Sequence, residues 1–553
     1  MSVCNKSNIK NIAYIVAVLV PIVYYFYLYN ALEAILVSIF SIIIIRSVCV
    51  FLFPVLHWRS NIGEIILFFL IVYCSVELTI GYLQLFGILK SRNSSYAITG
   101  LFNNPGPYGG FLAVCISLLA AYYVKNKNGQ RIDFFSKLLF GSASVIAAAS
   151  LVILPSTQSR TAILAIGCSM VFLALATERI RAMMKPFLKK YGLWLMLGLA
   201  VIGIGAYFYK KQSADGRFFM DKICIKTMCE NGWKGVGIGG FGGAYGEVQA
   251  SYFKKQIDEK GKDDLDWSAI NRHDLLTADC PDNAFNEYLF IGVEAGPITM
   301  FLFIGIIVFA IIISFKRGTI WCYGLTALAV FAMFSYPLHV LQFQVMLPVL
   351  LAAAMSDVEA NEIGKKSHEL VFQFSTIVLL SILSFMKGPE ITKYRQAENS
   401  WKKTERWHYS NYYEYVIEDC DSLLPYMKNH ERFLFAFGQS LNKTGDYVKS
   451  DSILKIGTEI SCDPMFWNVM GNNSLALGKY REAEERYKHA FYMVPNRLYP
   501  LYLLAQLYHT EGDTMRFLDM ADRVEKFLPK VESANTEQLR SVIRELKEDY
   551  ISQ

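Results

Sequence analysis

Long apolar runs fill the first 387 residues of the chain, and none occurs after them. A helix needs ~20 mostly apolar residues to cross the core of a bilayer. The candidate spans lie near residues 11–29, 31–56, 62–87, 107–124, 138–153, 161–176, 192–209, 288–315, 319–335, 338–355 and 370–387. Charged residues make up 18% of the 553 residues, against roughly 25% in soluble proteins. We therefore predict an all-α fold, with a polytopic transmembrane helix bundle of about 11 spans in 1–387 and a polar domain in 388–553.

Lysine and arginine in the connecting segments predict the orientation of this bundle, because cytoplasmic segments are enriched in them. With a cytoplasmic N-terminus, the short inner segments carry sixteen of these residues, and the short outer loops carry three, Lys90, Arg92 and Arg160. This bias places the long polar loop 210–287 on the periplasmic side of a bacterial inner membrane. An odd number of spans places 388–553 there too. The first apolar run lacks a following A-x-A cleavage site, so we predict a membrane anchor rather than a signal peptide.

The polar domain carries a pattern that recurs after 34 residues. One copy consists of Trp467, Met470, Gly471, Ser474, Gly478, Tyr480, Ala483, Tyr487, Ala490 and Pro495. The next consists of Leu501, Leu504, Ala505, Tyr508, Gly512, Phe517, Ala521, Val524 and Pro529. Small residues at Gly471, Ala483 and Ala490 would let paired helices touch, and proline would end each pair. We predict stacked tetratricopeptide-type hairpins, which either bind a peptide or protein partner or serve as a structural spacer.

Polar residues gather in four segments beside the predicted outer ends of the spans. The first holds Arg92 and TGLFNNP, and the second is STQSR, ending at Arg160. The third runs from Arg217 to GWKGVGIGGF, and the fourth is PDNAFNEY, which leads into the span 288–315. Arg160 opens an apolar helix, where an arginine either serves a site or extends its side chain to lipid headgroups.

Three weaker patterns do not indicate a cofactor. The sequence GVGIGG at 235–240 matches G-x-G-x-x-G, but it follows no predicted strand. The acidic run at 262–266 lacks the spacing of a calcium loop. The eleven cysteines lack metal-ligand spacing. We interpret them as unpaired apolar residues, or as forming a disulfide among Cys224, Cys229 and Cys280 if that loop lies outside the cytoplasm.

Over roughly residues 90–315, the four segments occur in the order found in the O-antigen ligase/polymerase superfamily of integral-membrane glycosyltransferases, which this chain resembles. TGLFNNPGPYGGFLA is similar to the family segment G-T-F-x-N-P-N, and TQSRTAILA is similar to S-R-x-A. GRFFMDKICIKTMCENGWKGVGIGGF is similar to G-R-x-x-x-W…P-L-x-G-x-G-x-x-x-F. DNAFNEYLFIGVEAGPITMFLF is similar to A-H-N-x-Y-L-x-x-x-x-E-x-G. Attached tetratricopeptide repeats also occur in such proteins.

The resemblance implies transfer of a glycan from a polyprenyl-diphosphate carrier to an acceptor hydroxyl at the periplasmic face. The acceptor is the lipid A core, a polysaccharide or a protein. Arg160 and Arg217 match the two key arginines of the family, which implies that they bind the diphosphate and stabilise its departing charge. No metal, nucleotide or other cofactor is expected, because the carrier is already activated.

One position departs from the family pattern. Phe285 stands where the family often has a histidine that activates the acceptor, and phenylalanine cannot accept a proton. We favour Glu287 as the base over Asp279, Asp282 and His273. The predicted catalytic residues are Arg160, Arg217, Asn286 and Glu287, and the predicted substrate-binding residues are Arg92, Asn104, His273 and Asp282. The alternative for Glu287 is a helix-cap or surface carboxylate, and for His273 an exposed loop histidine.

Three functions fit these features. The first is a glycan ligase, which the repeats favour because such an enzyme must hold a large acceptor. The second is a polysaccharide polymerase, for O-antigen or capsule, which differs only in its acceptor. The third, from another class, is a transporter or an assembly scaffold that gathers protein partners on its repeats. Transporters tend to carry polar groups near the membrane midplane, whereas here these groups gather at the outer edge. No feature indicates a nucleic acid partner.

Overall fold

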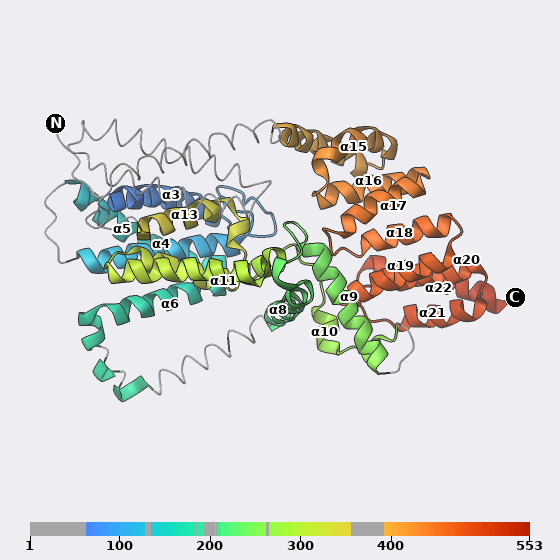
Figure 1. The fold of residues 1–553 in the computed structure, drawn as a ribbon, viewed down its shortest axis with the longest axis horizontal. Helices are drawn as coiled ribbons and strands as arrows, with labels where there is room; N and C mark the ends of the chain where they lie inside the picture. The colour runs from blue at the N-terminus through green and yellow to red at the C-terminus, as the bar shows by residue number, and fades with distance from the viewer. Residues whose placement is uncertain are drawn as a thin grey trace. The chain divides into compact units, whose positions relative to one another are not determined.

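The computed structural model describes residues 62–127, 134–183, 185–187, 189–192, 205, 208, 211–260, 265–355 and 392–552. Within these ranges the regular structure is helical, without a strand (Figure 1). Four of the described helices are long and apolar enough to cross a membrane. They are Gly63–Leu85, Pro105–Asn126, Phe134–Thr157 and Glu287–Lys316. The expected spans 11–29, 31–56 and 370–387, and most of 192–209, lie outside the described residues, so the total of about eleven stays a prediction.

The chain forms two compact units. The first comprises residues 1–210, 285–288 and 299–386, and the second comprises 211–284, 289–298 and 387–553. The long polar loop therefore shares a unit with the C-terminal helices. The domain boundary near residue 387 stays a prediction.

Helix α4 (Pro105–Asn126) is the most buried membrane helix of the first unit. It packs against α5 (Phe134–Ile153), α6 (Arg160–Ala176) and α12 (Trp321–Ala332). Small residues allow this close packing, because a side chain on Gly110 would overlap the Phe331 ring. Helices α3 (Ile62–Leu85) and α13 (Leu341–Met355) also belong to this unit, whereas α11 (Glu287–Lys316) is divided between the units, with residues 289–298 in the second.

The predicted spans at 161–176, 319–335 and 338–355 correspond to helices shorter than a bilayer core needs. Helix α6 is followed by a second helical stretch, Glu178–Phe187, which is bent from it by 90°. Helices α12 and α13 are joined through the one-turn helix η4 (Pro337–His339). The outer surface of α11 exposes large apolar residues such as Phe301 and Leu302, as expected of a helix that faces lipid.

The loop of the second unit is largely helical. It contains α8 (Lys211–Asn231), α9 (Phe241–Glu259) and the short α10 (Arg272–Thr277). Helix α9 packs against the C-terminal helix α19 (Tyr480–Met493). The Gln249 amide of α9 donates hydrogen bonds to the Met493 carbonyl at 2.5 Å and to the Asp279 carbonyl at 3.1 Å. A side chain on Gly242 or Gly243 would collide with backbone carbonyl groups of the C-terminal region, so the α9 backbone packs directly against that region.

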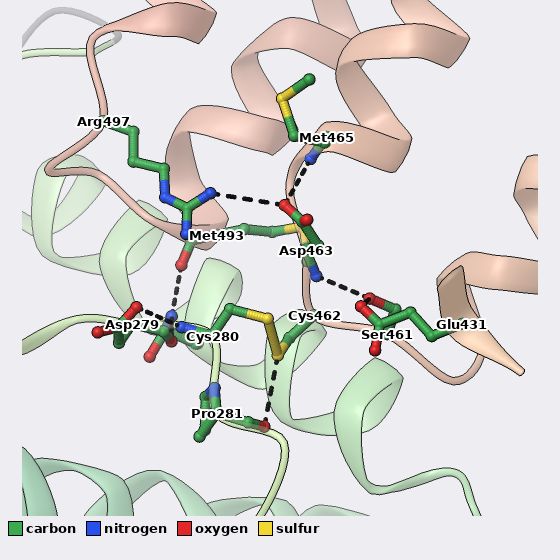
Figure 2. Close-up of a disulfide and its surroundings, with 11 residues drawn as sticks. Asp279, Cys280, Pro281, Glu431, Ser461, Cys462, Asp463, Met465, Met493 and Arg497 are labelled. Carbon is green, nitrogen blue, oxygen red and sulfur yellow. Dashed lines mark hydrogen bonds and ion pairs between the residues drawn. A yellow bond between two sulfur atoms is a disulfide. The ribbon is translucent and has the colours of Figure 1, made fainter. Parts of the chain in front are cut away.

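A disulfide joins Cys280 of the loop to Cys462 of the C-terminal region, 182 residues away (Figure 2). The expected interpretations, unpaired cysteines or a disulfide among Cys224, Cys229 and Cys280, are therefore wrong for this pair. Cys224 is buried and Cys229 is exposed, and both are free thiols. This disulfide depends on the tertiary structure, because the C-terminal region packs against the loop and brings a distant cysteine beside Cys280.

The C-terminal helices form antiparallel pairs: α16 (Glu431–Thr444) with α17 (Tyr447–Thr458), α18 (Met465–Ala476) with α19, and α20 (Tyr499–Glu511) with α21 (Thr514–Lys526). The first helix of each pair ends beside a left-handed glycine, Gly445, Gly478 or Gly512. Helices α15 (Tyr413–Met427) and α22 (Ala534–Ser552) flank the pairs. A side chain on Gly471 would overlap the Tyr487 ring, so the predicted small residue does bring these two helices together. The identification of the hairpins as tetratricopeptide repeats stays a prediction.

One arginine connects three of these helices. The Arg486 guanidinium on α19 forms two hydrogen bonds with the Asp451 carboxylate of α17, at 2.6 and 2.8 Å. It also donates to the Met470 carbonyl and the Ser474 hydroxyl of α18, and it lies 2.6 Å from a Glu482 carboxylate oxygen. Since the side chain is largely buried, these bonds hold the register between neighbouring hairpins.

Candidate functional site

In the first unit, the N-termini of α4 and α6 lie together. The Asn104 side chain caps α4 by accepting a hydrogen bond from the Gly106 N–H at 2.8 Å. Ser159 caps α6, and its hydroxyl donates to the Gly106 carbonyl at 3.5 Å. Arg160 is the first residue of α6 and is half-buried. Two of the predicted polar segments therefore meet. The positive ends of the α4 and α6 dipoles lie together, and Arg160 stands at one of them.

The segment before α4 is fixed by two buried polar side chains of α3. A Glu77 carboxylate oxygen accepts the Leu101 N–H at 2.9 Å, and the other accepts the Tyr73 hydroxyl at 2.8 Å. The Gln84 side chain accepts the backbone N–H groups of Thr99 and Gly100. Glu77 thus holds the loop at the helix end. Arg92, on the same connection, is exposed.

Glu287 begins α11 and has 2% exposure of its side chain. Its Oε2 accepts the Leu338 N–H at 2.9 Å, and its Oε1 lies 3.4 Å from Nδ1 of His339. The Glu287 carboxylate is therefore buried, and it contacts the connection between α12 and α13. It is not the surface carboxylate that the sequence left open as an alternative.

The residues on either side of Glu287 reach the same connection. The Phe285 ring meets the Tyr336 ring edge to face, with centroids 5.1 Å apart. The Tyr336 hydroxyl accepts a hydrogen bond from the Asn104 amide at 3.3 Å. Asn286 lies between Phe285 and Glu287 and is half-buried. The first and fourth polar segments thus meet through a connection, 333–340, that sequence reasoning did not include.

In the second unit, Arg217 is half-buried on α8, two residues after the buried Asp215. The Asp215 carboxylate lies 3.1 Å from Nε2 of His273, and an Asp274 oxygen lies 3.6 Å from Nδ1 of the same ring. The His273 side chain is 54% exposed, and its imidazole lies between these two carboxylates. Asp282 is exposed.

Asp274 also belongs to a compact hydrogen-bonded cluster. Lys222 lies 3.1 Å from its carboxylate, and the Tyr252 hydroxyl donates to the same oxygen. Burial raises the pKa of the Asp274 carboxyl, but the hydrogen bonds from Tyr252 and Lys222 outweigh it, so the pKa lies below its ordinary value. The pKa of Tyr252 is raised by burial and by its bond to Asp274. The cluster fixes α10 against α8 and α9.

The glycine-rich segment pairs with a break in α11. The N–H groups of Val236 and Gly237 donate to the carbonyls of Val293 and Glu294, both at 2.9 Å. The Glu294 carboxylate accepts the Gly239 N–H at 2.9 Å. Gly296, with φ of 86°, interrupts the helix, and a side chain there would collide with the Trp233 carbonyl. The glycine-rich segment therefore packs against the backbone of α11. The Gly-Pro pair inside an apolar run was the sequence feature that could have predicted the break in this helix.

The predicted residues are thus divided between the two units. The first unit holds Arg92, Asn104, Arg160, Asn286 and Glu287, and the second holds Arg217, His273 and Asp282. Convergence of the two arginines on one cavity stays a prediction. Among the described residues, no group of three or more histidine, cysteine, aspartate or glutamate side chains could hold a metal ion.

Comparison with known proteins adds one finding. Residues 143–304 match the sequence model of a protein family described as O-antigen ligase. The matched segment includes Arg160, Arg217 and Glu287, as well as the glycine-rich segment and the break in α11. No curated protein and no solved structure matches the chain.

Proposed function

We propose that this chain transfers a glycan from a polyprenyl-diphosphate carrier to an acceptor hydroxyl at the periplasmic membrane face. The match of residues 143–304 to the O-antigen ligase family supports this proposal. The observation that carries the proposal is the position of Arg160, inside the matched segment and at the joined N-termini of α4 and α6. The membrane helices supply the lipid-facing surface that such a carrier requires.

The leaving group in this reaction is a lipid diphosphate, which gains negative charge as the glycosidic bond breaks. Arginine offers a rigid fork of donors to phosphate oxygens and stays protonated. Helix N-termini add N–H groups and a positive dipole end. Arg160 and the starts of α4 and α6 suit this role, and Arg217 on α8 is proposed as the second phosphate ligand. The reaction needs no nucleotide and no metal, because the diphosphate is already an activated leaving group.

We favour a ligase over a polymerase, with the lipid A core or a protein as acceptor. The C-terminal hairpins form one unit with the loop that carries Arg217. A folded array of this size suits a large acceptor or a partner protein better than the end of a growing sugar chain. The proposed setting is the bacterial inner membrane, with a cytoplasmic N-terminus and a periplasmic C-terminal domain. The disulfide agrees with this orientation, since such bonds persist outside the cytoplasm.

Deletion of the gene and complementation with full-length variants tests the proposal. A ligase predicts that long glycans accumulate on the carrier and are lost from their acceptor, whereas a polymerase predicts single units. Arg160→Ala should reduce transfer by ~10²–10³, the typical cost of removing one donor to a developing anion. Arg160→Lys should restore it only in part. Lys90→Ala, an exposed cation on the same predicted side, is the control. Full complementation by Arg160→Ala at normal protein level would instead support a transporter or scaffold.

A further inference from the structure

The connection between α12 and α13 places one imidazole beside the buried carboxylate of Glu287. His339 ends the one-turn helix η4, and its side chain is 22% exposed, whereas that of Glu287 is 2% exposed. The carboxylate lies on the Nδ1 side of the ring, at 3.4 Å. A carboxylate at this distance stabilises positive charge on the ring, and Nε2 is the ring nitrogen on the side away from it.

Several contacts fix the backbone that carries this imidazole. The Leu338 N–H donates to Glu287, and the Leu338 carbonyl accepts a hydrogen bond from the Gln344 amide at 2.8 Å. Tyr336, at the start of the same turn, holds the Phe285 ring and the Asn104 side chain. The turn is thus tied to α4, α11 and α13 at once. Such a fixed orientation is what a general base requires.

We propose that His339 is the general base of the glycan transfer, and that Glu287 is a positioning residue that orients it and stabilises its protonated form. This inference rests on the proposed function. His339 Nε2 takes the proton of the acceptor hydroxyl while the hydroxyl oxygen bonds to the anomeric carbon of the donor sugar. The bond from that carbon to the diphosphate oxygen breaks, and its electron pair leaves with the lipid diphosphate. The imidazolium then gives its proton to solvent, which regenerates the base.

The other candidates suit the role less well. Glu287 is almost inaccessible and already accepts a backbone hydrogen bond, so an acceptor hydroxyl cannot reach it readily. At His273 each ring nitrogen faces a carboxylate, Asp215 at 3.1 Å and Asp274 at 3.6 Å. His339 faces its carboxylate with Nδ1 and is joined through Tyr336 to the polar segment that begins α4. It therefore combines partial access with a carboxylate beside Nδ1.

The test measures transfer in membranes of a deletion strain that carries full-length variants, with the carrier-linked glycan that accumulates in that strain as donor. We expect His339→Gln to lower kcat by ~10²–10⁴ with little change in KM for the donor. We expect added imidazole to restore part of the rate to His339→Ala but none to Arg160→Ala. Glu287→Gln should reduce kcat less than His339→Gln. Gln344→Leu is the matched control, because it disturbs the same turn and keeps the imidazole, so imidazole should not increase its rate.

Three results would overturn the assignment. One is a wild-type rate in both His339 variants. Another is a loss in His339→Ala that imidazole does not restore, at a protein level and thermal stability equal to those of the wild type. The third is rescue by imidazole of His273→Ala instead. A failure of the proposed function is distinguishable, since the wild-type chain itself would then transfer no glycan from the carrier.

Discussion

Removing the disulfide between the loop and the hairpins should loosen one defined contact. The perturbation is Cys462→Ser, compared with Cys280→Ser and with the double variant. The bond closes a segment of 182 residues, for which the chain-entropy relation gives about 5 kcal/mol. That figure is an upper bound here, because the segment includes α11, α12 and α13, which stay in the membrane when the second unit opens. Non-covalent contacts such as Gln249 to Met493 also persist. We therefore expect a loss of about 2–4 kcal/mol in the free energy of opening the unit.

Hydrogen exchange of the full-length protein in detergent measures this loss where it occurs. Exchange of amides in α9 and α19 should become roughly 30- to 700-fold faster if they exchange through opening of the whole unit. Each single variant and the double variant should give the same change, because all three remove one bond. Cys229→Ser, which removes an exposed free thiol, is the control and should change nothing.

The bond itself has a chemical readout. Under denaturing conditions, reduction before alkylation should add two alkyl groups to the wild-type chain and none to the variants. If wild-type protein from growing cells shows no such difference, the pairing is wrong, and so is the argument from it for a periplasmic loop and hairpins. If the losses of the two single variants add in the double variant, each cysteine stabilises the protein separately and the cross-link reasoning fails.

Three further perturbations act on other contacts. Gly471→Val should overpack the contact with Tyr487 and destabilise the hairpins by about 1–3 kcal/mol, and an unchanged unfolding midpoint would refute it. Arg486→Met should lower the free energy of unfolding by roughly 1–3 kcal/mol, since it leaves the partly buried Asp451 carboxylate without this partner, with the same midpoint as the measure. Asp274→Asn should destabilise the loop at neutral pH. The pKa of Asp274 is lowered in the folded state. Its contribution to the free energy of unfolding is therefore present above the unfolded pKa of about 3.9 and is lost as pH falls through the lower folded pKa. In a pH series, the difference in stability between wild type and variant should stay constant above about pH 4 and shrink below it.

Local patterns predicted the helical segments well, because burial and membrane crossing leave a periodic apolar signal. The run 138–153 became α5, and 288–315 became α11, each within a few residues. The small residues Gly471 and Ala483 are buried in the hairpins, as their spacing predicts. The family match confirms the resemblance that was based on short motifs around Arg160.

The contacts that shape the site left no such signal. The pairing of Cys280 with Cys462 and the proximity of Glu287 to His339 join segments that are far apart in sequence. Each depends on how whole helices pack, and neither partner has a periodic neighbourhood that would reveal it. Glu287 begins α11, but its buried environment depends on a turn 51 residues later. The helical content of the loop was also missed, although Phe219, Met220, Ile223 and Cys224 are buried at helical spacing on α8 and were the available signal.

The direct packing of α9 on the hairpins has a consequence for how such a protein can change. Gly242 and Gly243 lie against backbone carbonyls of the hairpin region, and no larger residue fits there. Asn496 of the hairpin region donates to the carbonyls of Leu275 and Ala278 in the loop, both at 2.8 Å. The hairpins are therefore not an exchangeable module. Recombination between related genes that replaced 392–552 alone would break this interlock, so the hairpins would have to be inherited together with the loop 211–284.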